Sequence, residues 1–262
     1  GVLIYQKNNG PAIEIDIPKT LNGNNTPFIV VDGDSVHLVV VSNQSDINYW
    51  KIANGAPSDR KVIATGTSLF LYGDVVLSGN NLYMGGFVGG KAVYWKYPKD
   101  AASAEAVSLS DETSAIIGGI AKSGDFIYLA GREQVDGGPR PFYWKLNTET
   151  NHVDKISVDT TGTITHIVVS GDTVYLSGSQ GSPSVGGYWK VSNDTDSTWC
   201  PIDGATSMTR LALDGTDLYA VRSHATSAAY WKINAETGEI LQQVPVASSD
   251  TGFSSISGIT VR

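Results

Sequence analysis

Five near-copies of one tripeptide, Tyr-Trp-Lys, divide this chain into regular segments. Successive tryptophans are 45, 49, 45 and 42 residues apart, and a degenerate copy, Tyr5-Gln6-Lys7, lies 44 residues before the first of them. A fixed period of this length indicates a repeat architecture in which each repeat is one supersecondary unit. Because the repeats extend along all 262 residues, we expect a single domain over residues 1–262. The five copies begin at Tyr49, Tyr94, Tyr143, Tyr188 and Tyr230.

Each repeat has the pattern of four antiparallel strands, and the fourth repeat shows it best. Residues 163–169 form a β-branched run, and Ser170-Gly171-Asp172 gives the tight turn into a second strand at residues 173–178. A third strand surrounds Trp189, and a fourth follows near residues 199–202. Four strands every 42 to 49 residues are typical of a β-propeller blade, so the sequence predicts an all-β propeller.

The two ends of the chain determine the predicted number of blades. Five complete four-strand units extend from about residue 26 to residue 246. Of the remainder, residues 2–7 match a third strand, residues 12–17 a fourth strand and residues 255–261 a first strand. We therefore predict six blades, the last closed by pairing of the N- and C-terminal strands. Five or seven blades are the alternatives, and whether the sixth blade is complete stays open.

Strand alternation gives the Tyr-Trp-Lys motif a structural role. Successive side chains of a strand point to opposite faces, so each Trp should face one neighbouring blade while its Tyr and Lys face the other. The indole would be buried between blades, and the Lys stem would cover an adjacent ring with its ammonium toward solvent or a turn carboxylate. A ring of cations around a channel is the alternative. Packing is favoured because the third strand is not the innermost one.

Composition excludes several classes of function. A net charge of −8 argues against a nucleic-acid backbone and an anionic membrane surface as partners. No run of 18 apolar residues predicts a membrane-spanning helix, so we expect no direct membrane insertion. Cys200 is the single cysteine, which rules out an internal disulfide and a Cys-based zinc site. The four histidines lack metal-ligand spacing, and we expect neither a metal nor a cofactor.

One turn of the fourth repeat resembles the Asp-box of sialidase-type propellers, whose pattern is Ser-x-Asp-x-Gly-x-Thr-Trp. Here Ser192, Asp194, Thr198 and Trp199 match, while Asp196 replaces the glycine. The turn lies between a third and a fourth strand, as the box does in that family. There the box is a folding element distant from the catalytic centre. The resemblance therefore supports a propeller and implies no catalytic residue.

The repeat as a whole is similar to repeats of bacterial propeller proteins. The shared pattern is a hairpin, Val-Tyr-Leu-Ser-Gly as at residues 174–178, a Gly-rich loop and then Tyr-Trp-Lys. Such proteins are often secreted or lipid-anchored at the cell surface. The resemblance implies architecture and a secreted, periplasmic or cell-surface location. The chain begins with Gly1, and no signal or lipid anchor is visible in it, so whether a signal peptide has been lost stays open.

One position breaks the repeat and marks a candidate site. Aligning the innermost strands on their turn glycines puts Phe28, Asp74, Gly119, His166, Arg210 and Gly258 at one place, while the next residue of each strand is aliphatic. That place lies at the predicted mouth of the central channel, and the loops between second and third strands emerge on the same face. Solvated polar residues in a wet channel are the plain alternative. The predicted ligand-binding residues are Phe28, Asp74, His166, Arg210, Arg132, Glu133, Arg222 and His224.

Three functions remain open. The favoured one is a non-enzymatic module that binds a protein or glycan, or acts as a scaffold, through the channel mouth. The second is a glycan-active hydrolase or lyase, in which Asp74 would need Glu133 or Asp136 as a partner carboxylate. The third is a purely structural domain. No motif for nucleophilic catalysis or phosphate binding occurs, and no pattern specifies the ligand or the oligomeric state.

Overall fold

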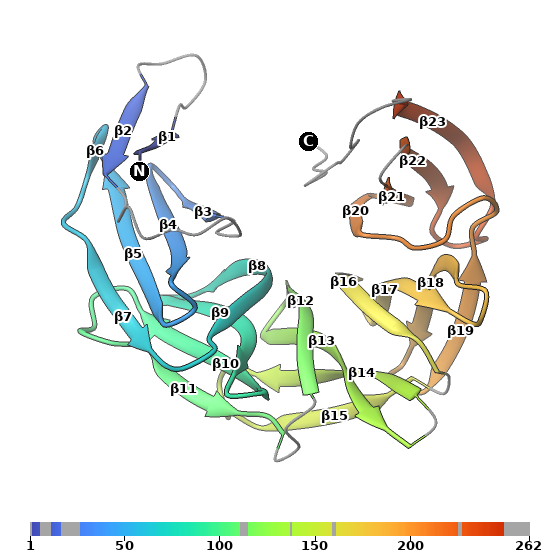
Figure 1. Cartoon of the computed structure of the whole chain (residues 1–262), viewed down its shortest axis with the longest axis horizontal. Coiled ribbons are helices and arrows are strands. Elements are labelled where there is room, and N and C mark those ends of the chain that lie inside the picture. The colour runs from blue at the N-terminus through green and yellow to red at the C-terminus, as the bar shows by residue number, and fades with distance from the viewer. Residues whose placement is uncertain are drawn as a thin grey trace. The chain divides into compact units, whose positions relative to one another are not determined.

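All regular structure in the described part of this chain is β-strand (Figure 1). The computed structural model describes residues 2–5, 12–16, 27–110, 115–136, 138–158, 161–224 and 227–248. Backbone packing divides the chain into two compact units, Gly1–Ile116 and Ile117–Arg262. The expectation of one propeller domain over residues 1–262 stays a prediction.

The first unit contains a two-stranded sheet and two complete blades. β1 (Val2–Tyr5) pairs antiparallel with β2 (Ile13–Asp16). In the first blade β3, β4, β5 and β6 follow in order, and β7 also pairs with β5. The strands of this blade are β3 (Phe28–Asp32), β4 (Ser35–Ser42), β5 (Asp46–Ala53), β6 (Ala56–Pro57) and β7 (Lys61–Thr65). Those of the second blade are β8 (Phe70–Ser78), β9 (Asn81–Val88), β10 (Lys91–Pro98) and β11 (Glu105–Ser108).

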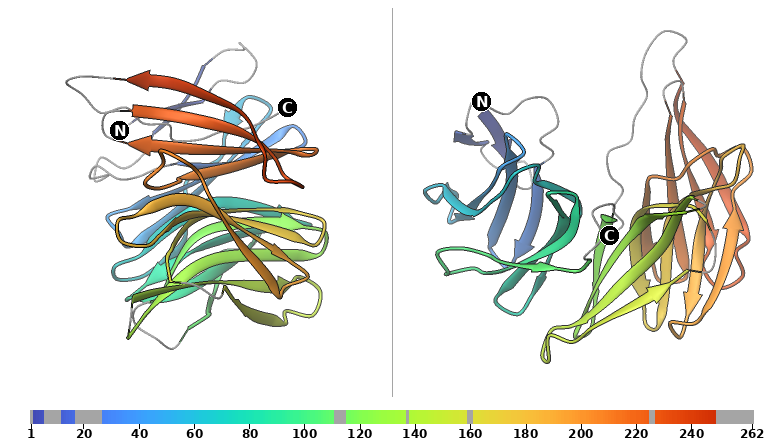
Figure 2. Two further views of the ribbon diagram at one scale, coloured as in Figure 1. Left: turned by 90° about the vertical axis from the view of Figure 1, so that its right-hand side faces the viewer. Right: turned by 60° about the horizontal axis from the view of Figure 1, so that its bottom comes forward.

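The second unit contains three four-stranded sheets, each in chain order; their strands lie side by side in Figure 2. The third blade consists of β12 (Ala115–Ser123), β13 (Phe126–Val135), β14 (Gly138–Asn147) and β15 (Val153–Ser157). The fourth consists of β16 (Thr163–Ser170), β17 (Thr173–Gln180), β18 (Val185–Ser192) and β19 (Asp196–Pro201). The fifth consists of β20 (Arg210–Asp214), β21 (Asp217–His224), β22 (Ser227–Asn234) and β23 (Ile240–Ser248). The five predicted repeats are thus all present as antiparallel sheets.

A common register aligns the five blades. Each Tyr-Trp-Lys copy lies on a third strand, and each Trp pairs across to an apolar residue of the second strand. We call residues that pair across neighbouring strands of one sheet a rung. In the fourth blade this rung consists of Ile167, Leu176 and Trp189, and in the fifth of Leu211, Ala220 and Trp231. The turn glycines used for the alignment are equivalent as well, because all five have φ between +55° and +58°, which favours glycine.

The predicted division of the motif between two blade faces is confirmed in the second unit. Trp189 is fully buried in a core that also contains Tyr128 and Tyr143 of the preceding blade. Its neighbour Tyr188 lies in a different core, with Trp231 of the following blade. The period-2 alternation of the strand produces this arrangement, since adjacent side chains leave opposite faces of the sheet. The indole is therefore an inter-blade packing element.

Strand β2 of the N-terminal pair packs against the first blade. Ile15 of β2 is 1% exposed and lies in a core with Trp50 and Leu38 of the first blade. On the innermost strand of that blade, however, Ile29 and Val31 are 48% and 61% exposed. The equivalents of Ile29 in the other four blades, Val75, Ile120, Ile167 and Leu211, are all 7% exposed or less. Residues 255–261, the predicted first strand of the sixth blade, lie outside the described residues.

Candidate functional site

Two innermost strands bulge at or just before the position that breaks the repeat. The pairing of β8 with β9 shifts between Leu71 and Val75, so that Asp74 lies inside the irregular segment. The pairing of β16 with β17 shifts between Ile164 and His166. A bulge adds residues to one strand, bends it and re-aims the side chains around it, and bulges are frequent beside functional sites. The backbone thus departs from regularity where the sequence does.

In the first unit, the two candidate residues have different surroundings. Phe28 is half-buried and packs against the core that contains Val39 and Tyr49. Asp74 is exposed and follows Gly73, whose positive φ of +79° places it in the left-handed region. Phe28 therefore contributes to packing, whereas the bulge of β8 presents Asp74 at the surface.

An aromatic cluster beside Asp74 was not anticipated from the sequence. The rings of Phe70 and Phe87 are opposite each other on β8 and β9, with centres 4.8 Å apart and planes at 24°. Tyr72 lies 6.3 Å from Phe70 and 5.8 Å from Phe87, at 15° and 17°. Tyr72 is 41% exposed. We call Phe70, Tyr72 and Phe87 the aromatic platform. The sequence signal was the longer irregular segment Tyr72-Gly73-Asp74, which the repeat alignment treated as ordinary strand.

In the second unit, His166 lies in a tightly packed contact between innermost strands. It is 5% exposed, and its Nδ1 accepts a hydrogen bond from the backbone N–H of Leu211 at 3.3 Å. On the other side, a Cβ added to Gly119 would lie 2.9 Å from the Cα of His166. The neighbouring Thr165 donates its hydroxyl to the carbonyl of Met208 at 2.6 Å. His166 thus connects β16 to β20 by a hydrogen bond. Position 119 is a glycine because β12 and β16 approach each other too closely for a side chain there.

The remaining candidates of the fifth blade lie near the start of β20 and the end of β21. Arg210 is half-buried and pairs across to Val221. Arg222 donates from Nη1 to the carbonyl of Gly204, and its guanidinium carbon lies 5.8 Å from the centre of the Trp231 ring. His224 ends β21. These residues share the end of the sheet away from the β20–β21 turn, as the alignment predicted.

The third blade contributes the long hairpin that the sequence predicts. Its strands β13 and β14 have 10 residues each. Arg132 and Glu133 lie near the tip of the hairpin and pair across to Pro141 and Arg140. The carboxylate of Glu133 accepts a hydrogen bond from Nζ of Lys155 at 2.5 Å. Glu133 is thus engaged in an ion pair within its own blade.

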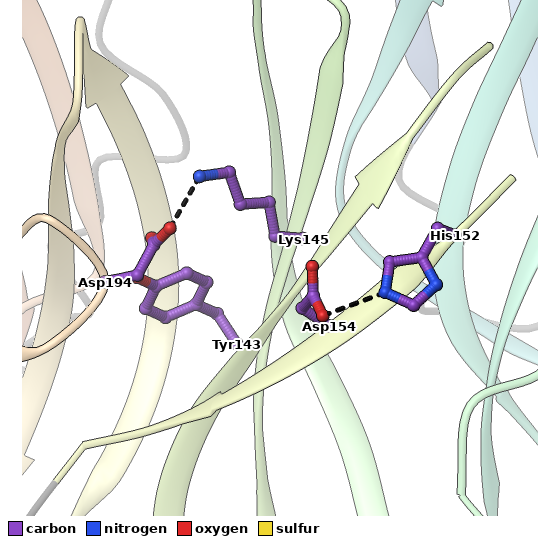
Figure 3. A network of polar contacts seen from close by, with 5 residues as sticks. All are labelled: Tyr143, Lys145, His152, Asp154 and Asp194. Atoms are coloured by element: carbon purple, nitrogen blue, oxygen red, sulfur yellow. Dashed lines mark hydrogen bonds and ion pairs between the residues drawn. The ribbon is translucent and has the colours of Figure 1, made fainter. Parts of the chain in front are cut away.

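The Asp-box-like turn makes an inter-blade contact (Figure 3). Tyr143 donates its hydroxyl to Oδ1 of Asp194 at 2.7 Å, and Lys145 donates Nζ to Oδ2 at 2.5 Å. Burial, and then the hydrogen bond to Asp194, raises the pKa of Tyr143 well above its ordinary value. Burial alone would lower the pKa of Lys145, but the contact with Asp194 leaves that pKa raised. The predicted direction of the lysine, toward a turn carboxylate, is confirmed here.

A similar contact joins the fourth and fifth blades. Lys190 donates Nζ to the carbonyls of Ala235 and Glu236 at 3.0 and 2.9 Å. Tyr175 donates its hydroxyl to the same carbonyl of Ala235 at 3.2 Å. In both cases the motif lysine contacts the turn between the third and fourth strands of the next blade. Lys145 and Lys190 are therefore part of the packing between blades, whereas Lys232 pairs with Asp217 of its own blade at 2.8 Å.

Neither a metal centre nor a membrane helix stands out in the described part of the chain. No group of three or more His, Cys, Asp or Glu side chains there could hold a metal ion. Among the same residues, no helix has the length and apolar character needed to cross a membrane.

No known family model matches this chain, and no curated protein resembles it in sequence. Similar solved structures exist at low identity. The N10 neuraminidase-like protein of A/little yellow-shouldered bat/Guatemala/060/2010 has a TM-score of 0.56 and 9% identity, over 86% of this chain and 83% of that one. A PL25 ulvan lyase bound to -[GlcA(1-4)Rha3S]- has a TM-score of 0.56 and 13% identity, over 90% and 73%. A chain of a nidogen/laminin complex has a TM-score of 0.56 and 10% identity, over 88% and 83%.

These similar structures are β-propellers, and they establish the fold of this chain. The predicted all-β propeller is confirmed at that level. At 9 to 13% identity the likeness concerns the fold alone, since one fold hosts many unrelated functions.

Proposed function

We propose that this propeller is a non-enzymatic binding or scaffold module whose ligand contacts the residues around the irregular starts of the innermost strands. The observation that carries the proposal is the coincidence of two features. Strands β8 and β16 bulge at the position of Asp74 and His166, and this position varies from blade to blade while the next one is always aliphatic. Bulges are frequent beside functional sites, so the two bulges at this position support the proposal.

The structure narrows the residues expected to reach a ligand. His166 and Phe28 contribute mainly to packing, and Glu133 is held by Lys155. Arg222 is partly exposed but already contacts Gly204. Exposed or half-buried polar groups therefore provide the proposed recognition. These are Asp74 in the first unit and, in the second unit, Arg132, Arg210 and Arg222.

A protein or a glycan is the proposed partner class. Proteins of similar fold include a chain of a nidogen/laminin complex and a polysaccharide lyase, so the fold is compatible with both. A glycan-active hydrolase or lyase is the alternative function, and a purely structural domain is the third. A glycosidase requires two carboxylates at a defined separation, and the ion pair of Glu133 with Lys155 makes that side chain a poor partner for Asp74.

The experiment compares ligand capture by the wild type and two matched double variants. The purified chain is applied to a glycan array and used in a pull-down against surface and secreted proteins. Asp74→Ala with Arg210→Ala should abolish capture with little change in melting temperature. Asp125→Ala with Lys122→Ala removes the same charges near the β12–β13 turn and should leave capture intact. Unchanged capture by the first variant would refute the placement of the site, and turnover of a captured glycan would favour the enzyme.

We also propose the sixth blade and the location that the sequence predicts. Residues 255–261 would form its first strand, with β1 and β2 as its third and fourth. The packing of Ile15 against Trp50, together with the exposure of Ile29 and Val31, supports a further blade there. Hydrogen exchange tests this: slow exchange in residues 2–5 and 255–261 is expected, and free exchange in both would exclude closure.

Secretion or exposure at a bacterial cell surface rests on the repeat resemblance and is tested by fractionating the producing cells.

A further inference from the structure

We propose that the aromatic platform of the second blade binds an uncharged pyranose unit of a glycan, which stacks on the ring of Tyr72. This inference rests on the proposed binding function and specifies its ligand class. A pyranose with mostly equatorial hydroxyls has a flat face of C–H groups that carry weak positive charge. The face of an aromatic ring is negative, so such a sugar and a tyrosine ring attract each other in a stacked geometry.

The platform holds Tyr72 in a fixed orientation. Its ring is within 17° of parallel to both Phe70 and Phe87, and those two rings stack on each other across the β8–β9 pair. Tyr72 is also 41% exposed, which leaves part of its side chain accessible. A ring that is already oriented loses little conformational entropy on binding, and this favours affinity.

Comparison with the fourth blade shows that the blade architecture does not require these rings. There, Thr163 and Ser179 occupy the rung equivalent to Phe70 and Phe87, one residue before the bulge. Their hydroxyls are 3.0 Å apart and hydrogen-bond to each other. A small polar pair thus closes this end of the sheet in one blade, whereas a stack of large rings occupies it in the other. The additional apolar surface of the second blade is therefore free to serve recognition.

The charge beside the platform selects an uncharged sugar. Asp74 is exposed and lies two residues after Tyr72 on the same bulge. A carboxylate can accept about four hydrogen bonds, so it can accept one from a sugar hydroxyl while keeping another contact within the protein. It would repel the carboxylates or sulfates of an acidic glycan, and the net charge of −8 adds to that repulsion.

Calorimetric titration with defined hexasaccharides tests the proposal. The probes are cellohexaose, chitohexaose and xylohexaose, with hexagalacturonate as the acidic counterpart. The wild type should bind at least one neutral probe with a Kd of about 1 mM or below, and should bind hexagalacturonate more weakly. Tyr72→Ala and Tyr72→Leu should weaken binding at least about tenfold, while Tyr72→Phe, which keeps the ring, should stay within about threefold.

Two controls keep loss of binding distinct from loss of fold. Melting temperatures of all variants are measured, and Tyr72→Leu retains apolar bulk if the alanine variant proves unstable. Ile240→Ala removes an equally exposed apolar side chain on β23 and should leave binding unchanged.

Three outcomes would overturn the proposal: no neutral probe binds, the acidic probe binds more tightly, or a folded Tyr72→Leu variant binds as the wild type does.

Failure of this proposal can be distinguished from failure of the proposed function. If a protein is captured while no neutral hexasaccharide binds, the platform proposal fails and the binding module stands. The same follows if glycan binding is lost with Asp74→Ala and Arg210→Ala but survives in Tyr72→Leu. If neither proteins nor glycans are captured, both proposals fail.

Discussion

Asp194 accepts a hydrogen bond from the hydroxyl of Tyr143 at 2.7 Å, although the two residues are 51 positions apart and belong to successive blades. The same carboxylate accepts from Lys145, two residues after Tyr143. The Asp-box-like turn of the fourth blade is thus held by the Tyr-Trp-Lys motif of the third (Figure 3). Asp194 has a φ of +60°, a conformation in which aspartate is more frequent than most other residues. Two features that the sequence shows separately form one contact.

Removing this carboxylate should destabilise the second unit. Asp194→Ala leaves the Tyr143 hydroxyl and the Lys145 ammonium without this acceptor, and hydrogen bonds to charged groups are worth about 1.5–3 kcal/mol. We expect the free energy of unfolding, from urea denaturation, to fall by about 1–3 kcal/mol. Asp203→Ala, at an exposed turn of the same unit, should change it by less than about 0.5 kcal/mol. Equal effects of the two substitutions would show that the contact is energetically neutral.

The tryptophan and lysine of one motif copy should differ strongly in their contribution to stability. Trp144 is 2% exposed and packs edge-on against Phe142, with ring centres 4.4 Å apart. Trp144→Ala should therefore lower the free energy of unfolding by roughly 3–5 kcal/mol. Lys145→Ala should cost less, because its side chain is 20% exposed and solvent screens the ion pair. Urea denaturation of both variants makes the comparison. Similar losses would contradict the assignment of the indole as the main packing element.

Because β12 and β16 approach each other closely, adding a single methyl group at Gly119 should destabilise the second unit. Gly119→Ala would place a Cβ 2.9 Å from the Cα of His166 and 3.0 Å from the backbone nitrogen of Ile167. Backbone cannot yield as a flexible side chain does, so we expect destabilisation of about 1–3 kcal/mol or more. Lys122→Ala, on the exposed side of the same strand, is the control and should be nearly neutral. A fully stable Gly119→Ala variant would show that the strands have room to separate.

A buried histidine predicts how the first unit responds to acid. His37 is 1% exposed; its Nδ1 lies 2.8 Å from the Tyr49 hydroxyl and its Nε2 lies 3.6 Å from Oδ2 of Asp32. Burial, reinforced by the charge of Lys99, lowers the pKa of His37 despite the attraction of Asp32. The folded state therefore binds this proton less readily than the unfolded state, and stability should fall as the pH drops below about 6.5.

The pKa of Asp32 is also lowered, chiefly by its hydrogen bond from Lys99, so its contribution is lost only at more acidic pH. Just below about pH 6.5, before the carboxylates bind protons, the loss should come from His37, with a slope of at most about 1.4 kcal/mol per pH unit. His37→Gln keeps a polar group that does not titrate and should flatten this part of the profile. His152→Gln, whose ring is largely exposed, should not. Identical profiles for wild type and His37→Gln would refute the assignment.

The repeat pattern predicted the fold well because the information is local and periodic. Trp189 and its equivalents recur at one rung of every third strand, and the turn glycines share one conformation. Period-2 alternation then separates Trp189 from Tyr188 without any knowledge of the neighbouring blades. The fold class, the strand order and the packing role of the motif all follow from these patterns.

The surroundings of the candidate site depended on contacts that no local pattern specifies. His166 has the residue type of a ligand-binding group, yet the approach of β12 and β20 buries it between strands. Phe28 lies at the same rung and packs into a core, while the bulge of β8 leaves Asp74 exposed beside Tyr72. Sequence alone determined where along each strand the repeat is broken. Only the tertiary structure decided which of those side chains are buried, because burial depends on how closely neighbouring strands approach and where the backbone bulges.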